Sequence, residues 1–149
     1  MRVNAVIRII SKQKTENGDN TGEMSVLGRV TYEDDKSIIE YIENNEETGP
    51  EETTITVIID DTVSIVRNGQ FSSEMMVEKN NRHLTFYRTP YGELTMGIYG
   101  NQVEWSRDEK GATLKMRYSL DFNNGLISEN TMIIYIEEKQ GEKRYVKIS

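Results

Sequence analysis

Residues 113–122 of this chain, Thr-Leu-Lys-Met-Arg-Tyr-Ser-Leu-Asp-Phe, alternate between polar and apolar side chains without a break. The apolar positions are Leu114, Met116, Tyr118, Leu120 and Phe122. Successive side chains of a β-strand point to opposite faces, so this spacing predicts a strand that buries one face and exposes Lys115 and Arg117 on the other. The stretch therefore assigns this part of the chain to a half-buried β-sheet.

The same period of two recurs along most of the chain. The predicted strands are Arg2 to Lys12, Glu23 to Tyr32, Ser37 to Glu43, Thr53 to Ile59, Thr62 to Arg67, Glu74 to Lys79, His83 to Arg88, Glu93 to Tyr99, Gln102 to Arg107, Ala112 to Phe122, Ser128 to Glu138 and Lys143 to Ile148. Turn residues separate most of them, at 17–22, 48–50, 68–69, 90–92, 100–101, 110–111, 123–125 and 140–141. Short links predict an antiparallel up-and-down order. So many strands favour closure into a single all-β barrel over residues 1–149, with at most one short helix.

One segment fits two structures. Ser37 to Asn44 carries isoleucine and tyrosine at spacings that suit a helix as well as a strand. We predict a strand there. In the helical alternative, the acidic segment that contains these residues would form a lid over one mouth of the barrel.

The composition narrows the class of partner. The 149-residue chain has no cysteine and a formal charge of −7, and the segment from Glu33 to Asp61 holds eleven acids against the single base Lys36. An acidic chain repels phosphate backbones, so nucleic-acid binding is not expected. The acidic segment is either a solvated hairpin or an acidic recognition surface. No stretch approaches the roughly 20 apolar residues of a membrane helix and no signal peptide is evident, so we expect a soluble, cytoplasmic protein without a membrane partner.

The sequence contains no established motif for catalysis or metal binding. The lone histidine, His83, cannot supply a multi-histidine metal site and has no adjacent serine or acid for a relay, so we expect it to end a strand. Residues 16–23 offer oxygen ligands and glycines but lack the spacing of a calcium loop, and a flexible hairpin tip explains them equally well. We therefore assign no catalytic residue, no metal site and no cofactor, and an enzyme is the less favoured class.

The candidate binding residues are those that a barrel would turn inward. Arg67 shares a strand face with Val63 and Ile65, and a buried arginine needs a partner, which in a ligand-binding barrel can be a carboxylate or a phosphate. Two alternatives stay open: the Arg67 head lies in water at the strand end, or it pairs inside a filled barrel with Glu104 or Glu129. Bulky side chains would form the wall. The predicted ligand-binding set is Arg67, Tyr87, Trp105, Met116, Tyr118 and Phe122.

Short motifs along the chain add a family resemblance. Val63 to Gly69 looks like a strand followed by a turn, Thr89 to Gly92 like a hallmark turn, and Tyr118 to Asn130 like the long late strands of the YwiB-like family of small bacterial proteins. Their order and spacing make the chain resemble that family over most of its length. The resemblance implies a calycin-like (lipocalin-like) β-barrel with a central cavity. It brings no assigned activity, so ligand and reaction stay open.

Two functions from different classes fit these observations. The first is a barrel that binds a small, partly apolar molecule in its cavity, with Arg67 holding an anionic group of that molecule. The second is a protein-interaction or homodimerising module whose barrel is filled and holds no ligand. A cavity lined by the predicted residues would favour the first function. A packed interior with an exposed apolar patch would favour the second.

Overall fold

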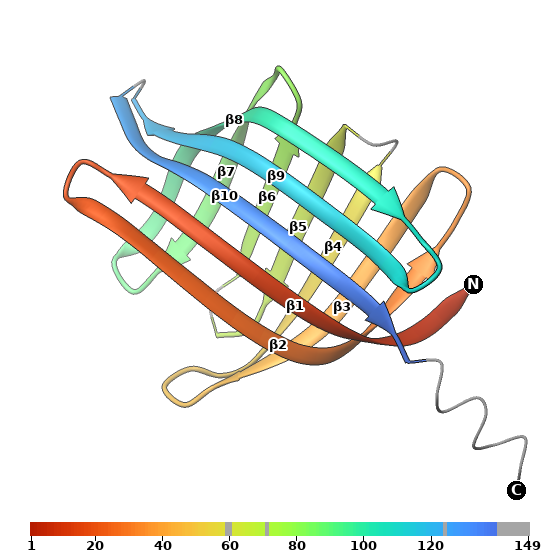
Figure 1. Ribbon diagram of the computed structural model, residues 1–149. Helices are drawn as coiled ribbons and strands as arrows, with labels where there is room; N and C mark the ends of the chain where they lie inside the picture. The colour runs from red at the N-terminus through yellow and green to blue at the C-terminus, as the bar shows by residue number, and fades with distance from the viewer. Residues whose placement is uncertain (59–60, 71, 124, 140–149) are drawn as a thin grey trace, which may run out of the picture.

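The computed structural model describes residues 1–58, 61–70, 72–123 and 125–139, and the side chains of residues 87–89 are not described. This part of the chain forms ten strands: β1 (Arg2–Thr15), β2 (Gly18–Tyr32), β3 (Lys36–Asn45), β4 (Gly49–Ile58), β5 (Thr62–Asn68), β6 (Ser73–Glu78), β7 (Arg82–Thr89), β8 (Gly92–Arg107), β9 (Gly111–Phe122) and β10 (Gly125–Glu138). Each strand pairs antiparallel with its neighbours in the chain, and β1 also pairs with β10, which closes the barrel (Figure 1). The predicted all-β, up-and-down barrel is confirmed.

The segment that fitted two structures is a strand. β3 pairs along its length with β4, and its first half pairs with β2 until Gly28 lies opposite Tyr41. Ser37, Ile39 and Tyr41 alternate inward, which is the period of a strand. The described residues form no helix, so the alternative of a helical lid is wrong. The same residues contain no helix with the length and apolar character needed to cross a membrane.

Two of the predicted turns lie inside strands. Gly100 and Asn101 form a β-bulge in β8, so the two strands predicted there are one. Glycine is needed at this bulge because a Cβ on Gly100 would run into the backbone carbonyl of Glu78. Residues 18–22 belong to β2 and pair with β1, so the predicted flexible tip shrinks to residues 16–17. The strand predicted over Lys143 to Ile148 lies outside the described residues.

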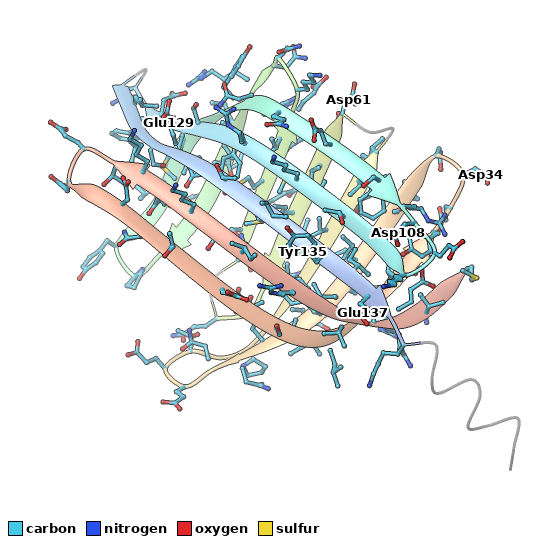
Figure 2. The ribbon with its side chains drawn as sticks, in the orientation of Figure 1. Asp34, Asp61, Asp108, Glu129, Tyr135 and Glu137 are labelled. Atoms are coloured by element: carbon cyan, nitrogen blue, oxygen red, sulfur yellow. The ribbon has the colours of Figure 1, made fainter. Side chains whose placement is uncertain are left out.

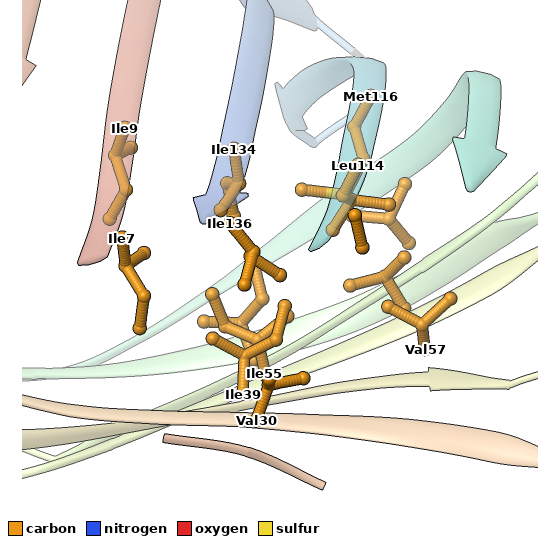
Figure 3. Close-up of a cluster of buried hydrophobic side chains, with 14 of the residues drawn as sticks. Ile7, Ile9, Val30, Ile39, Ile55, Val57, Leu114, Met116, Ile134 and Ile136 are labelled. Atoms are coloured by element: carbon orange, nitrogen blue, oxygen red, sulfur yellow. The ribbon is translucent and has the colours of Figure 1, made fainter. Parts of the chain in front are cut away.

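The simple strand order gives the barrel two ends. Turns from odd- to even-numbered strands lie at one end, which we call the distal end. Turns from even- to odd-numbered strands lie at the other, the terminal end, together with Met1 and Glu138 (Figure 1). Between them the interior is packed with fully buried aliphatic side chains (Figure 3), including Ile7, Val30, Ile39, Ile55, Leu114 and Ile134. The middle of the barrel interior is therefore lined by apolar side chains that are shielded from solvent.

The alternating stretch in β9 behaves as predicted over most of its length. Its buried side chains are Leu114, Met116, Tyr118 and Leu120, and its exposed ones include Lys115 and Arg117. Phe122 has the same parity but is 47% exposed, because it is the last residue of the strand and lies beyond the packed core. The predicted faces are therefore right, but Phe122 is not part of a buried wall.

Candidate functional site at the distal end

Polar side chains replace the aliphatic core toward the distal end. Tyr41, Thr53 and Arg67 are cross-strand neighbours on β3, β4 and β5, because Thr53 lies opposite Tyr41 in one ladder and opposite Arg67 in the next. All three lie on the inward side, since each is two residues along its strand from a fully buried isoleucine. The register thus places a phenol, a hydroxyl and a guanidinium next to one another inside the barrel.

Arg67 is a partly buried cation, and it makes one weak ion pair within the described part of the chain. Its side chain is 27% exposed, and its Nε lies 3.8 Å from Oε1 of Glu51, whose side chain is 31% exposed. At this distance the charges attract without a hydrogen bond, so the guanidinium donors stay available to another acceptor. Glu104 and Glu129 are the partners that Arg67 would have in the filled-barrel alternative. Both are exposed, which does not support that alternative; Figure 2 shows Glu129 on β10.

The pKa of the Tyr41 hydroxyl is raised, and its causes identify the groups around it. Burial is the largest cause and raises the pKa, the charge of Arg67 lowers it, and the carboxylates of Glu43 and Glu51 raise it. The hydroxyl of Thr53 also lowers the pKa of Tyr41, although the two hydroxyls do not meet hydrogen-bond geometry. Both acids and the arginine are therefore close enough to Tyr41 to act on its charge.

Thr53 carries a buried hydroxyl without a partner. Its Oγ1 is shielded from solvent and makes no hydrogen bond to any group that the structure describes. A buried hydroxyl left unsatisfied costs about 1–3 kcal/mol. Within a polar cluster, such an atom is a place where a ligand or a water molecule completes the hydrogen bonding.

Together these groups can recognise a small polar headgroup. Arg67 offers guanidinium donors, Tyr41 and Thr53 offer hydroxyls, and Glu43 and Glu51 offer acceptors. A guanidinium can hold a carboxylate or phosphate through two parallel hydrogen bonds, and such a bidentate contact is stronger than an ion pair at 3.8 Å. No three His, Cys, Asp or Glu side chains in the described ranges converge as ligands for a metal ion.

A hollow lies at the terminal end, and the predicted residue Trp105 is part of its wall. It has a volume of about 280 Å³, and its wall includes Trp105, Arg107, Ser37 and Val57 besides the acidic turn of residues 33–35. Acidic side chains gather at this end, where Figure 2 shows Asp34 and Asp108. The guanidinium of Arg107 stacks on the ring of Tyr32 at 3.5 Å from the ring centre, which is a cation–π contact.

Trp105 and Arg67 therefore do not share a site. Arg67 is level with Thr53 on β4, whereas Val57, which lines the hollow of Trp105, is four residues further along that strand. Four residues of extended strand span about 13 Å. The predicted ligand-binding set is divided between the two ends of the barrel.

The other predicted residues are spread along the interior. Met116 is fully buried in the packed middle, and Tyr118 is buried closer to the distal end, where β9 finishes with the half-exposed Phe122. The backbone of Tyr87 pairs with β6 and β8 near the distal end, and its side chain is not among the described ones. Only Tyr118, Phe122 and Tyr87 share the end of the barrel that holds Arg67.

Tyr41, Thr53 and Glu51 belong to this cluster but were not among the residues predicted from the sequence. Tyr41 and Thr53 occupy inward positions of predicted strands. A residue with a hydroxyl at a position where the pattern calls for an aliphatic side chain was the available signal. Glu51 precedes the strand predicted from Thr53 onward. The pairing register of β4 with β5 brings Glu51 beside Arg67. The alternation of apolar residues within each strand does not specify how two strands pair.

His83 has an acidic partner that the sequence analysis did not anticipate. It lies near the start of β7, and its Nε2 is 2.7 Å from Oε1 of Glu78, on the other side of the β6–β7 turn. Both side chains are about one third exposed. The pair joins two strand ends, and it lies at the terminal end, away from the Arg67 cluster.

The fold defines a small, closed, up-and-down antiparallel β-barrel protein. The chain belongs to the family DUF1934, described as a domain of unknown function, whose model matches residues 7–134. A similar solved structure is the crystal structure of the ywiB protein from Bacillus subtilis, with a TM-score of 0.81 and 16% sequence identity over 93% of this chain and 94% of that chain. The resemblance to the YwiB-like family is confirmed, and at this identity the likeness shows the fold alone. No curated protein matches the sequence.

Proposed function

We propose that the protein binds a small, partly apolar molecule at the distal end of its barrel, with a carboxylate or phosphate of that molecule held by Arg67. The observation that carries the proposal is the inward row of Tyr41, Thr53 and Arg67. Among the residues that the structure describes, its guanidinium has only a weak ion pair and its buried threonine hydroxyl has no partner. Both groups gain hydrogen bonds when an anionic headgroup binds. We expect this binding to take place in the cytoplasm.

The apolar part of the ligand would lie on side chains that the packed core leaves partly uncovered. Met24 and Val26 of β2 are partly buried and pack against the core. They follow the last β2–β3 pair, Gly28 with Tyr41, in the direction of the distal end. Methionine is flexible and polarisable, so this surface can adapt to apolar groups of different shape.

Glu51 allows a test in which two substitutions should change anion binding in opposite directions. Because it is the ion-pair partner of Arg67, it competes with an incoming carboxylate. Glu51→Gln removes the competing charge and should tighten anion binding, whereas Arg67→Met should abolish it. If the Arg67–Glu51 pair is purely structural, no ligand binds there, and the two substitutions cannot change ligand binding in opposite directions.

A thermal-shift series with straight-chain monocarboxylates and phosphate monoesters of increasing length tests the proposal. A ligand present at 100 times its Kd stabilises the fold by about 2.7 kcal/mol through mass action. The shift should vanish in Arg67→Met, grow in Glu51→Gln and persist in Arg117→Met, which removes an exposed cation on β9. A series in which no compound shifts the melting temperature, or in which Arg67→Met responds like the wild type, rejects the proposal. Native mass spectrometry of freshly purified protein would report a retained ligand and its stoichiometry.

A protein-interaction function is the second candidate, and one observation favours it. Leu84 and Phe86 on the outward side of β7 are about half exposed. They lie next to Arg82, which makes two hydrogen bonds to the carboxylate of Asp121, at 3.0 and 2.7 Å. Apolar side chains exposed beside an ordered ion pair suit a protein partner. Phe86→Ser should then weaken association in sedimentation experiments and leave the response to carboxylates unchanged.

A further inference from the structure

The distal half of β2 carries a free strand edge. Residues 18–27 pair with β1 along their whole length, but the ladder with β3 ends at Gly28 and Tyr41. Beyond that point β3 continues to Asn45 and pairs with β4 only. In the described part of the chain, the backbone groups on this side of β2 therefore face no other strand. Such an edge is a template for pairing with another strand.

This edge has few of the features that usually prevent pairing, because its charged residues are Asp19 and Glu23 alone. The sequence from Gly18 to Leu27 contains no lysine, arginine or proline. Its central acid, Glu23, is turned over β1, where Oε1 lies 2.7 Å from Nε of Arg8. Residues 18–23, 25 and 27 are exposed, so other parts of the described chain do not cover the edge.

A hollow adjoins the point where β2 and β3 part. It has a volume of about 290 Å³, and its wall includes Leu27, Arg29, Ile42 and Glu52. Leu27 and Ile42 are 65% and 51% exposed. A strand added to the free edge would end in this hollow and remove both apolar side chains from water.

We propose that the free edge pairs with the same edge of a second copy of the chain, antiparallel across a twofold axis at Met24. Such an axis places residues opposite each other when they are equally far from it along the two strands. Glu23 of one copy then lies opposite Ser25 of the other. In this register residues 21–27 of the two copies face each other, and this is a part of the edge that β3 leaves free in both. An axis at Glu23 would instead oppose two glutamates, which is unfavourable.

The inward sides of the two edges also fit in this register. The axis puts Met24 against Met24 and places Gly22 opposite Val26, so that a large side chain meets a small one. Met24 and Val26 are only partly buried in the single chain. The pairing therefore covers apolar surface on the inward side as well as at Leu27 and Ile42 on the outer wall.

Cysteine cross-linking tests the axis directly, because the chain has no cysteine of its own. In Met24→Cys the two thiols would lie opposite each other, at the Cβ separation of about 4.5–5.5 Å of a cross-strand pair, and mild oxidation should give a covalent dimer. In the control Asp19→Cys the two thiols would be about 33 Å apart along the strands and should stay reduced. Cross-linking that is equal in the two variants, or absent from both, overturns the proposal.

A charge at Ser25 tests the register. Ser25→Lys places a cation opposite Glu23 of the second copy twice in each dimer, so the Kd should fall roughly three- to tenfold, and Ser25→Glu should raise it by a similar factor. Within one chain, Arg8 lies opposite Ser25, so the new carboxylate of Ser25→Glu gains Arg8 as a partner. The substitution should therefore not weaken the fold, and a weaker dimer would report on the interface itself.

Sedimentation velocity over a hundredfold range of protein concentration measures both shifts, and Phe86→Ser serves as the control at the other exposed apolar pair. The wild type should dimerise, the two Ser25 variants should move in opposite directions, and Phe86→Ser should behave as the wild type. Three results would each refute the edge-to-edge dimer: wild type and Ser25→Lys monomeric at every concentration, both Ser25 variants moving the same way, or Phe86→Ser alone abolishing the dimer.

Discussion

The packed middle and the distal end of this barrel are built on the same strands but from different side chains. On β4, Ile55 is fully buried among aliphatic groups, while Thr53, two residues along the same face, is just as buried but polar and without a partner. On β5, Ile65 gives way to Arg67 in the same manner. A barrel optimised for stability alone would continue the aliphatic pattern. Under the proposed function, the distal end gives up stability for ligand binding.

Methionine truncation should produce the largest difference between the two regions. Met116→Ala removes a fully buried side chain from the middle and should lower the free energy of unfolding by about 2–5 kcal/mol. Met24→Ala removes the same side chain where it is partly buried and should cost less than about half as much. Urea denaturation followed by circular dichroism measures both. Equal losses would mean that the distal end is packed as tightly as the middle.

Gly28 marks the boundary between the two regions, and alanine there should have the next largest effect. An added Cβ would run into the carbonyl oxygen of Glu40 and the side chain of Ile7, so Gly28→Ala should cost about 1–3 kcal/mol. At Gly22, on the distal part of the same strand, the nearest atom to an added Cβ is the movable Ser11 Oγ at 3.0 Å. Gly22→Ala should change stability by less than about 1 kcal/mol in the same urea experiment. A loss at Gly22 that matches the loss at Gly28 would erase the boundary.

The fold was predictable where the information is local. Alternation along β9 correctly placed Leu114 inside and Lys115 outside, because the direction of a side chain depends only on its own strand. The bulge at Gly100 was mistaken for a turn, since glycine followed by asparagine is typical of both. Only the close approach of the Glu78 backbone distinguishes them, and that contact joins residues far apart in the sequence.

The site was less predictable because it depends on register. The strand pattern correctly placed Arg67 on the inward face with Val63 and Ile65. Its neighbour Glu51 follows from the pairing of β4 with β5, which a hydrophobic pattern does not specify to the residue. Trp105 was grouped with Arg67 because both are inward. The two residues lie at opposite ends of the barrel, and an inward or outward pattern does not say how far along the barrel a residue lies.

Alkaline pH should affect both regions through buried tyrosines. Burial is the main cause that raises the pKa of Tyr32, at the terminal end, to about 12, and it also raises the pKa of Tyr41 at the distal end. Each hydroxyl holds its proton more tightly in the folded chain than in the unfolded chain, where the pKa is about 10. The resulting stability is therefore complete below pH 10 and is lost as the pH rises toward the folded pKa.

Urea unfolding at a series of pH values from 8 to about 12 checks this sign. The free energy of unfolding should fall above pH 10 in the wild type, and Tyr32→Phe should make the fall less steep, because phenylalanine has no proton to lose. Tyr41→Phe makes the same test at the distal end. A fall that is equally steep in the wild type and in both variants would exclude the two tyrosines as its source.

Two buried threonines inside the barrel give the smallest expected effect. Thr85 Oγ1 donates a hydrogen bond of 2.6 Å to the carbonyl oxygen of Glu74, so Thr85→Val should cost about 0.5–1.5 kcal/mol. Thr53→Val removes a hydroxyl without a partner and adds a methyl group of similar size, so the free energy of unfolding should rise or change by less than about 0.5 kcal/mol. The same variant, Thr53→Val, should lose part of the carboxylate-induced thermal shift.

A hydroxyl that binds ligand should give unchanged stability together with a weaker response to ligand when it is removed. A side chain that serves only in packing should not give this combination. If Thr53→Val is as costly as Thr85→Val, the Thr53 hydroxyl has a structural partner, and the distal end belongs to the core.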